Sequence, residues 1–363
     1  MYALTNATVH TATDRGTVDG GVLVEGSEIR AVGDIDVPDG AEVLDCDGEH
    51  VTPGLIDAHS HAGMAEWGEP EDADINELTD PVTPHVSALD GFHPHDEELD
   101  HAVQGGVTTV SARMGSANVI GGVICSMKTQ GNLADEMFLR EDGMKAAMGE
   151  NPKRTHGEQR DREPATRSGV AATLREALMR AEDYRDRRDH AAEEGEPFER
   201  DLGMENLVRV LAGDLPLRVH AHRADDIMTV FRIVEEFGID EFSIEHATTF
   251  ETPGLLHEAG VTVAIQTDAP VLPQEHLDVC VGLAVREGLP ADAALDTVTR
   301  NPAAILGIED RVGTLEEGTD ADLAVWNDEF YTFDSTAQHV FVDGEHVFDH
   351  ERDATDLREE WER

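Results

Sequence analysis

Several apolar segments of this chain end in a histidine or an aspartate, and this pattern constrains the fold more than any other feature. Residues 51–58 precede His59 and His61, residues 217–219 precede His220, residues 242–245 precede His246, and residues 261–267 precede Asp268. Side chains two apart on a strand share a face, so His59 and His61 can hold one metal ion from one side. A hydrogen-bonded core position explains any one of these histidines, but it explains the whole set poorly. The pattern therefore favours a metal centre built from several strand ends.

The middle of the chain alternates strands with helices. Strand-like segments at 107–111, 217–222, 241–246 and 261–266 are separated by helical ones, and 168–194 is the clearest helix. Repeated strand and helix units predict parallel βα units, and in a βα barrel the chemistry lies at the carboxyl ends of the strands.

Both ends of the chain differ from the middle. Residues 1–50 and 310–350 contain short strand-like segments joined by turn residues, among them Asp343-Gly344. We expect these two regions to form one composite β-sandwich. Residues 351–363 are expected to form a charged C-terminal tail.

The charge of the chain is strongly negative. Its 363 residues contain 77 acidic and 27 basic side chains, a net charge of −50, and only three lysines. Such a surface repels nucleic acid, and high salt would screen its self-repulsion. This composition favours a halophilic protein, with an acidic mesophilic protein that binds a basic partner as the alternative.

Cysteine usage and hydropathy bear on location. Cys46, Cys125 and Cys280 never form a CxxC pair, which argues against a disulfide scaffold and a cysteine-only zinc site. No apolar stretch reaches 18 residues, and the first ten residues lack a secretory pattern. We therefore expect a cytoplasmic protein that binds neither membrane nor nucleic acid.

Six motifs together make the chain similar to a known superfamily. They are PGLIDAHSH (53–61), GGVTTV (105–110), VHAH (219–222), EHAT (245–248), QTDAP (266–270) and GTDADLAVW (318–326). With these motifs the chain resembles the amidohydrolase superfamily, in the branch that includes imidazolonepropionases and metal-dependent prolidase-like enzymes. The resemblance spans nearly the whole chain. It implies a TIM-like (β/α)8-type barrel of residues 51–309 flanked by a sandwich from both termini. It also implies a metal-dependent hydrolase of carbon–nitrogen bonds, with an amide or cyclic amide as its small-molecule substrate.

The resemblance also implies roles for the strand-end residues. His59, His61 and His220 would be metal ligands, Asp268 a ligand and general base, and His246 a ligand or the group that orients the attacked carbonyl. Neutral imidazoles hold a divalent cation with an open position, and the cation lowers the pKa of a bound water toward about 7. Zinc is the default ion, with iron or manganese as alternatives, at one or two ions per chain.

Many relatives bridge two metals with a carboxylated lysine, so the few lysines of this chain are candidates for that role. Lys128 ends an apolar stretch and is the favoured bridge, while Lys145 could bridge metals or hold an anionic substrate group. The further substrate-contact candidates are His222, Arg223, Glu150, Lys153 and Arg154. Glu245 is expected to point away from the barrel axis if His246 points in.

The pattern departs from the family at one place. Only residues 247–260 separate the His246 strand from the Asp268 strand, which leaves the chain one βα unit short of the family pattern. We therefore count seven strands. A gap in the barrel would leave a sheet edge to cover, which gives a reason to expect a homo-oligomer. The missing unit also leaves open that the chain is a catalytically silent metal-binding protein. A further alternative is a prolidase-like metallo-dipeptidase that would hold a free carboxylate near Arg223 or Arg154.

Overall fold

The computed structural model describes residues 1–65, 74–246 and 249–353, and they build two β-sheets with helices around the second sheet. The predicted charged tail falls largely outside the described residues, which end at 353. No helix in the described part of the chain is long and apolar enough to cross a membrane.

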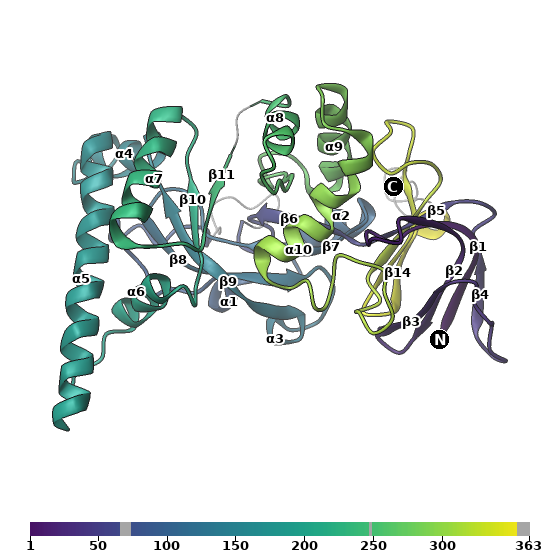
Figure 1. The fold of residues 1–363 in the computed structure, drawn as a ribbon, viewed down its shortest axis with the longest axis horizontal. Coiled ribbons are helices and arrows are strands. Elements are labelled where there is room, and N and C mark those ends of the chain that lie inside the picture. The colour runs from purple at the N-terminus through teal and green to yellow at the C-terminus, as the bar shows by residue number, and fades with distance from the viewer. Residues whose placement is uncertain (66–73, 247–248, 354–363) are drawn as a thin grey trace, which may run out of the picture.

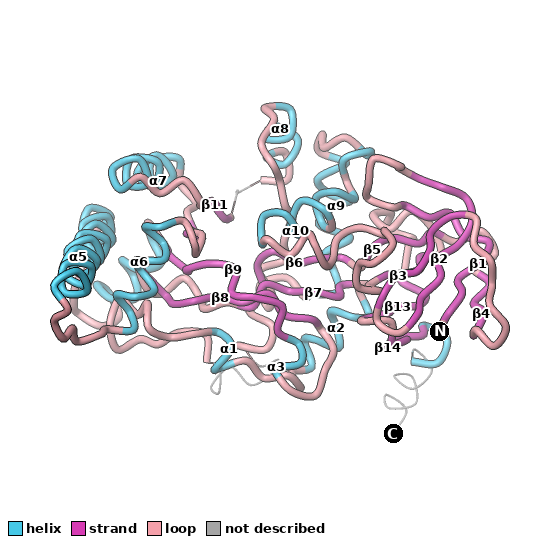
Figure 2. Tube along the Cα trace, turned by 60° about the horizontal axis from the view of Figure 1, so that its bottom comes forward, coloured by secondary structure: helices cyan, strands magenta, loops and turns pink. Residues whose placement is uncertain are grey.

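The first sheet, here called the terminal sheet, combines both ends of the chain. It contains β1 (Tyr2–His10), β2 (Thr17–Glu25), β3 (Glu28–Gly33), β4 (Glu42–Asp45), β5 (His50–Pro53), β12 (Leu323–Trp326), β13 (Ala337–Val342) and β14 (Glu345–Asp349). The order is β14-β13-β12-β5-β1-β2-β3, and β4 pairs with β1. Because β12 runs antiparallel to β5, the C-terminal strands continue the N-terminal ones in one sheet (Figure 2).

The second sheet, here called the central sheet, carries the predicted strand ends. It contains β6 (Leu55–Ser60), β7 (Val107–Ala112), β8 (Ile120–Lys128), β9 (Phe138–Ala147), β10 (Leu217–His220) and β11 (Phe242–Glu245). Their order is β11-β10-β9-β8-β7-β6. The β6–β7, β9–β10 and β10–β11 pairs are parallel, so β6, β7, β9, β10 and β11 present their carboxyl ends at one rim.

The prediction of uninterrupted parallel units is wrong at β8, which runs antiparallel to both neighbours. A parallel connection needs a crossover of a dozen or more residues. Only residues 113–119 separate β7 from β8, and 129–137 separate β8 from β9, with the four-residue helix α3 (Ala134–Met137) inside the second loop. Connections this short return the chain as a meander.

The remaining helices follow the chain around the central sheet. They are α1 (Ala88–Gly91), α2 (Glu97–Gln104), α4 (Glu150–Lys153), the π-helix η1 (Arg154–Glu158), α5 (Arg167–Glu194), α6 (Leu202–Ala212), α7 (Ala224–Phe237), α8 (Thr252–Glu258), η2 (Gln274–His276), α9 (Leu277–Arg286), η3 (Ala291–Ala293), η4 (Leu295–Val298) and α10 (Arg300–Leu306). In Figure 1, α5, α6 and α7 stand at the end of the molecule opposite the terminal sheet.

The long helix α5 forms much as its sequence predicts. The Thr166 hydroxyl accepts a hydrogen bond from the backbone N–H of Gly169 at its start, and Gly195 ends it in the left-handed conformation. Its apolar stripe, which includes Leu174 and Leu178, joins side chains of α6, α7, β9 and β10 in one buried cluster. This cluster holds β9 and β10 in place and thereby supports the rim.

The strand predicted at 261–266 is absent, because this segment has no regular ladder to a neighbour. It is held instead by single bonds: Ile265 N donates to the Thr297 carbonyl, and Asp268 N donates to the His59 carbonyl at 3.1 Å. The central sheet of the described residues therefore has six strands rather than the seven counted from sequence, with β6 and β11 as its edges.

Candidate active site

The rim of the central sheet brings the predicted histidines and aspartate together. His59 is the penultimate residue of β6 and His61 directly follows this strand, while His220 ends β10 and His246 follows β11. The ring centres of His59 and His246 are 4.5 Å apart, and those of His220 and His246 are 4.2 Å apart. Asp268 Oδ1 lies 3.1 Å from His59 Nε2 and 3.3 Å from His61 Nε2. Five residues from four distant segments thus meet at one point.

The hydrogen bonds of two histidines orient their other ring nitrogens toward the centre of the cluster. His59 Nδ1 lies 2.8 Å from Glu245 Oε2, and His61 Nδ1 lies 2.7 Å from the carbonyl oxygen of Arg113. A carbonyl or carboxylate oxygen only accepts, so both Nδ1 atoms carry the proton. In the neutral rings each Nε2 then presents a lone pair toward Asp268 Oδ1.

Two further ring nitrogens have no partner. Nε2 of His220 and Nε2 of His246 are buried, and neither has a hydrogen-bond partner among the described residues. The other nitrogen of His220, Nδ1, is 2.8 Å from the hydroxyl of Ser116. Buried polar atoms without partners are rare in native proteins. Their presence beside clustered lone pairs fits a site that binds a cation.

Burial keeps the imidazoles neutral. It lowers the pKa of His59 to about 4, with the nearby cations Lys145 and Arg113 adding to the effect. Burial also lowers the pKa of His220 to about 2 and the pKa of His246 below its usual range. Burial opposes ionisation of Asp268, but the pKa of this carboxyl still lies below its ordinary value, so Asp268 is ionised at neutral pH. Neutral imidazoles and an ionised carboxylate are the forms that bind a divalent metal.

The expectation that Glu245 points away from the site is wrong. Glu245 is buried, accepts from His59 Nδ1, and pairs with Arg113 Nη1 at 2.5 Å. Regular alternation ends at Glu245 because His246 has a backbone φ of +71°, outside the strand conformation. Both neighbours can therefore face the rim.

Arg113 is a residue that the motif analysis missed. It is fully buried just after β7, contacts Glu245, and donates through Nη2 to the carbonyl oxygen of Ala58. Arg113 and nearby Lys145 hold the pKa of Glu245 well below its usual range, against the effect of burial. An arginine directly after the apolar strand 107–112 was the available signal, since a buried guanidinium requires an anionic partner.

The structure separates the two candidate lysines. Lys145, near the end of β9, is fully buried with Nζ 3.4 Å from His59 Nε2 and 3.8 Å from Glu245 Oε2. Burial lowers its pKa to about 8. Lys128 ends the antiparallel strand β8 and therefore lies away from the rim.

The preference for Lys128 as a metal bridge is thus overturned by its contacts. Its Nζ lies 2.9 Å from Asp320, 2.8 Å from Asp322 and 3.0 Å from Asp343, carboxylates of the segments around the terminal sheet. These three charges raise the pKa of Lys128 although burial acts in the opposite direction. Lys128 ties the central sheet to the terminal sheet.

The other rim candidates divide into two groups. The ring of His222 is exposed and lies 4.5 Å from that of His220 and 5.4 Å from that of His246, so it borders the cluster. Arg223 instead makes two 2.9 Å contacts with the carboxylate of Asp225.

The candidates on α4 are occupied by local pairs. Lys153 Nζ is 3.0 Å from Glu150, and Arg167 reaches the same carboxylate at 3.0 Å. Among the described contacts, none joins Glu150, Lys153 or Arg154 to the histidine cluster.

A second layer of polar groups supports Asp268. The buried carboxylate of Asp57 accepts from the hydroxyl of Thr267 at 2.6 Å and from its backbone N–H at 3.1 Å. Gln274 donates to the same carboxylate and accepts from Ser60. This network fastens the irregular segment to β6 and sets where Asp268 lies.

Comparison with known proteins places this geometry in a family. Residues 220–348 match the model of an amidohydrolase family. The chain is 30% identical over 392 residues to the amidohydrolase tasK of Hapsidospora irregularis, an alignment that covers 91% of this chain but only 40% of that protein. It is 27% identical over 333 residues to an imidazolonepropionase of Mesorhizobium japonicum, with 79% of this chain and 80% of that protein covered.

A solved structure is similar over nearly the full length. An amidohydrolase from Thermotoga maritima MSB8 superposes with a TM-score of 0.92 at 39% identity, covering 96% of this chain and all of that one. The resemblance expected from the sequence motifs is thereby confirmed. The chain belongs to the amidohydrolase family, whose members are hydrolases that act on carbon–nitrogen bonds and generally use a divalent metal.

Proposed function

We propose that this chain is a metal-dependent amidohydrolase that cleaves a non-peptide carbon–nitrogen bond, in an amide or cyclic amide, with Asp268 as general base. The observation that carries the proposal is the meeting of three electron-pair donors at one point. Asp268 Oδ1 lies 3.1 and 3.3 Å from Nε2 atoms of His59 and His61 whose protons sit on the opposite nitrogen. Such atoms repel one another unless a cation lies between them.

The distances suit a shared ion. Ligands about 2.0–2.2 Å from one zinc ion lie roughly 3–3.6 Å apart. His220 and His246 add buried ring nitrogens without partners next to the same point. Nitrogen and carboxylate ligands suit zinc, with iron or manganese as alternatives. A divalent ion held there would supply Lewis-acid activation of a water molecule.

Asp268 is placed to move the proton. Its side chain is 22% exposed, so one edge of the carboxylate faces the open side of the cluster, and Oδ2 lies 3.6 Å from His246 Nδ1. In the proposed reaction Asp268 takes a proton from the attacking water and delivers it to the leaving nitrogen. His246, beside it, would serve as a ligand or orient the carbonyl that is attacked.

Glu245 and Arg113 position the first ligand. The Glu245 carboxylate accepts a hydrogen bond from the Nδ1–H group of His59. This bond maintains the tautomer whose Nε2 faces the cluster. Arg113 neutralises the charge of Glu245. Lys145 is the remaining candidate for a carboxylated bridge, because its lowered pKa leaves part of its amine neutral near pH 8.

A cyclic amide is favoured over a dipeptide as the substrate. The similarity to an imidazolonepropionase covers about four fifths of both chains. The carboxylate pocket expected of a dipeptidase has less support, since the guanidinium of Arg223 is paired with Asp225. The three cysteines are buried and unpaired, in keeping with the cytoplasmic location that we also propose.

The test compares Asp268→Asn with Asp142→Asn. Asp142 is also buried, but it accepts from Ser111 and Ser126. We expect Asp268→Asn to keep much of its metal while turnover of cyclic amides falls about 10²–10⁴-fold, because an amide cannot act as a base. Metal content is measured by elemental analysis and turnover with a panel of cyclic amides, linear amides and dipeptides.

Three outcomes separate the readings. An Asp268→Asn variant as active as the parent would disprove the role of this residue. Turnover restricted to dipeptides would favour the metallo-dipeptidase. A parent protein that binds metal but hydrolyses nothing in the panel would favour the silent metal-binding protein.

A further inference from the structure

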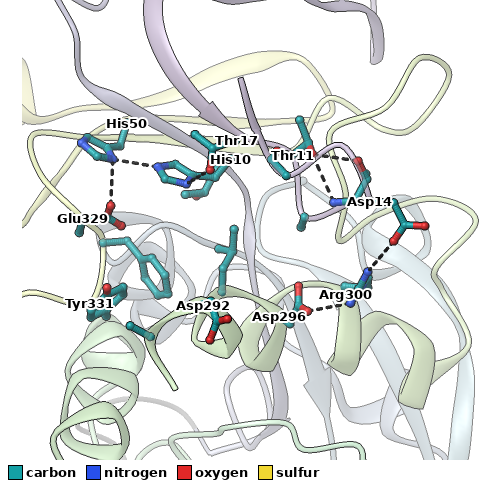
Figure 3. Close-up of a pocket in the computed structure, with 17 residues that line it drawn as sticks. His10, Thr11, Asp14, Thr17, His50, Asp292, Asp296, Arg300, Glu329 and Tyr331 are labelled. Carbon is teal, nitrogen blue, oxygen red and sulfur yellow. Dashed lines mark hydrogen bonds and ion pairs between the residues drawn. The ribbon is translucent and has the colours of Figure 1, made fainter. Parts of the chain in front are cut away.

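A second cluster of metal-binding side chains lies in the terminal sheet, on three neighbouring strands. The sheet order is β12-β5-β1. His10 is the last residue of β1, His50 is the first residue of β5, and Glu329 follows β12 by three residues. Figure 3 shows the two imidazoles and the carboxylate turned toward one another at one end of a cavity.

Their atoms are close enough to share one ion. His10 Nε2 is 2.8 Å from His50 Nδ1, and His50 Nδ1 is 3.9 Å from Glu329 Oε1. One ligand atom from each residue lies within 4.8 Å of the others. We propose that His10, His50 and Glu329 form a structural binding site for a divalent metal ion of the zinc class, separate from the active site.

The geometry needs only a small adjustment. Two nitrogens at about 2.0–2.1 Å from a tetrahedral zinc ion are roughly 3.3 Å apart, so the imidazoles must separate by about 0.5 Å. The side chain of Glu329 is 43% exposed and can rotate inward, while that of His50 is 22% exposed. The hydroxyl of Thr17, 3.2 Å from His10 Nδ1, orients the first ring.

The surroundings favour a cation. The three side chains border a cavity of about 540 Å³, which can supply a water molecule as the fourth ligand. Asp14, Asp292 and Asp296 also line this cavity, against one guanidinium, Arg300. That guanidinium is engaged, 2.8 Å from Asp296 and 3.8 Å from Asp14.

The site would join distant parts of the chain. An ion held by His10, His50 and Glu329 closes a loop between the N-terminal strands and the segment after β12. Because the ion binds only the folded chain, it stabilises the terminal sheet by mass action.

The experiment uses Zn²⁺ alone as the probe. The background is the full chain with the rim cluster disabled by His59→Ala and His61→Ala. In this background we expect one Zn²⁺ per chain by calorimetric titration and elemental analysis, together with a rise in Tm on adding Zn²⁺. His50→Ala should abolish both effects, and Glu329→Gln should weaken binding at least 10-fold.

Asp292→Asn is the matched control, because it removes one negative charge from the same cavity without removing a ligand. It should change the affinity less than 3-fold. Equal weakening by Glu329→Gln and Asp292→Asn would show attraction by charge alone and overturn the proposal. Unchanged Zn²⁺ content in His50→Ala would also overturn it.

A second measurement tests the site even if the background variant with His59→Ala and His61→Ala fails to fold. In the chain with an intact rim, Glu329→Gln keeps the size of a half-exposed side chain and should fold. In a Zn²⁺ titration it is expected to need at least 10-fold more free Zn²⁺ than the parent to bind its last ion, whereas an unchanged titration would overturn the site. This affinity does not depend on hydrolytic activity, so the site and the proposed function can fail independently.

Discussion

Glu245 and His246 at the rim show where alternation along a strand stops predicting which way a side chain faces. Alternation predicts that only one of Glu245 and His246 faces the site. Both do, because the positive φ of His246 ends the strand at that residue. Asp268, with a φ of +58°, likewise lies on an irregular backbone. Alternation therefore fails for Glu245 and His246, whereas His61, two residues after His59, meets the same oxygen of Asp268 as alternation predicts.

The two buried lysines allow a direct test of the metal bridge. If Lys145 is a carboxylated bridge, Lys145→Met should lower the metal content per chain, because a ligand is lost. Lys128→Met should leave the metal content unchanged. It should instead lower the free energy of unfolding by about 3–5 kcal/mol, because the buried carboxylate of Asp322 loses its counter-charge. Elemental analysis and urea denaturation report the two effects.

The opposite result for Lys145 is equally informative. An ammonium 3.4 Å from His59 Nε2 competes with a cation for the same lone pair. Tighter metal binding by Lys145→Met would therefore mean that Lys145 acts as an ammonium, and the bridge would be wrong.

Among the elements, the direction of β8 explains why the prediction of Lys128 as a metal bridge was wrong. An apolar run followed by Lys128 gives no sign of strand direction, which depends on the length of the flanking connections. Since β8 is antiparallel to β7 and β9, its end lies at the edge opposite the ends of β9 and β10. Lys145 reaches the rim because β9 is parallel to β10, with Ala147 opposite His220 in the register.

Helix α9 contains an acidic residue whose ionisation opposes folding. Burial raises the pKa of Asp278 from 3.8 to about 6. Between these values the folded chain binds more protons than the unfolded one, so this contribution to stability falls as the pH rises through the interval. Asp278→Asn should therefore raise the free energy of unfolding by roughly 2 kcal/mol at pH 7–8, and by little at or below pH 4.

Denaturation of both proteins at several pH values tests this. Asp186→Asn, an exposed change on α5, should stay within about 0.5 kcal/mol of the parent throughout. A gain for Asp278→Asn that does not depend on pH would contradict ionisation as the cause.

The charge of the complete chain governs its stability in dilute buffer. At a net charge of −50, carboxylates on all sides repel one another. The screening length falls from about 30 Å at 0.01 M salt to about 3 Å at 1 M. We expect Tm to rise steeply with KCl concentration and the protein to unfold at low salt.

KCl suits this measurement better than a sulfate salt, because sulfate strengthens apolar burial whatever the charge. Equal Tm values in 20 mM and 2 M KCl would remove the basis for a halophilic interpretation. The expected homo-oligomer stays a prediction, which sedimentation in high salt can test.

Local chemistry in the sequence was enough to recognise the family and the histidines with Asp268 as a group. Ligand identity and strand ends are local properties, and short motifs preserve them. The tertiary structure decided the rest: which lysine lies near the histidines, that Glu245 and Arg113 support His59, and that the segment before Asp268 is no strand. These features depend on strand direction, on backbone angles at two residues, and on which buried charges meet. All three arise from contacts between segments far apart in the sequence, so a local sequence pattern does not predict them.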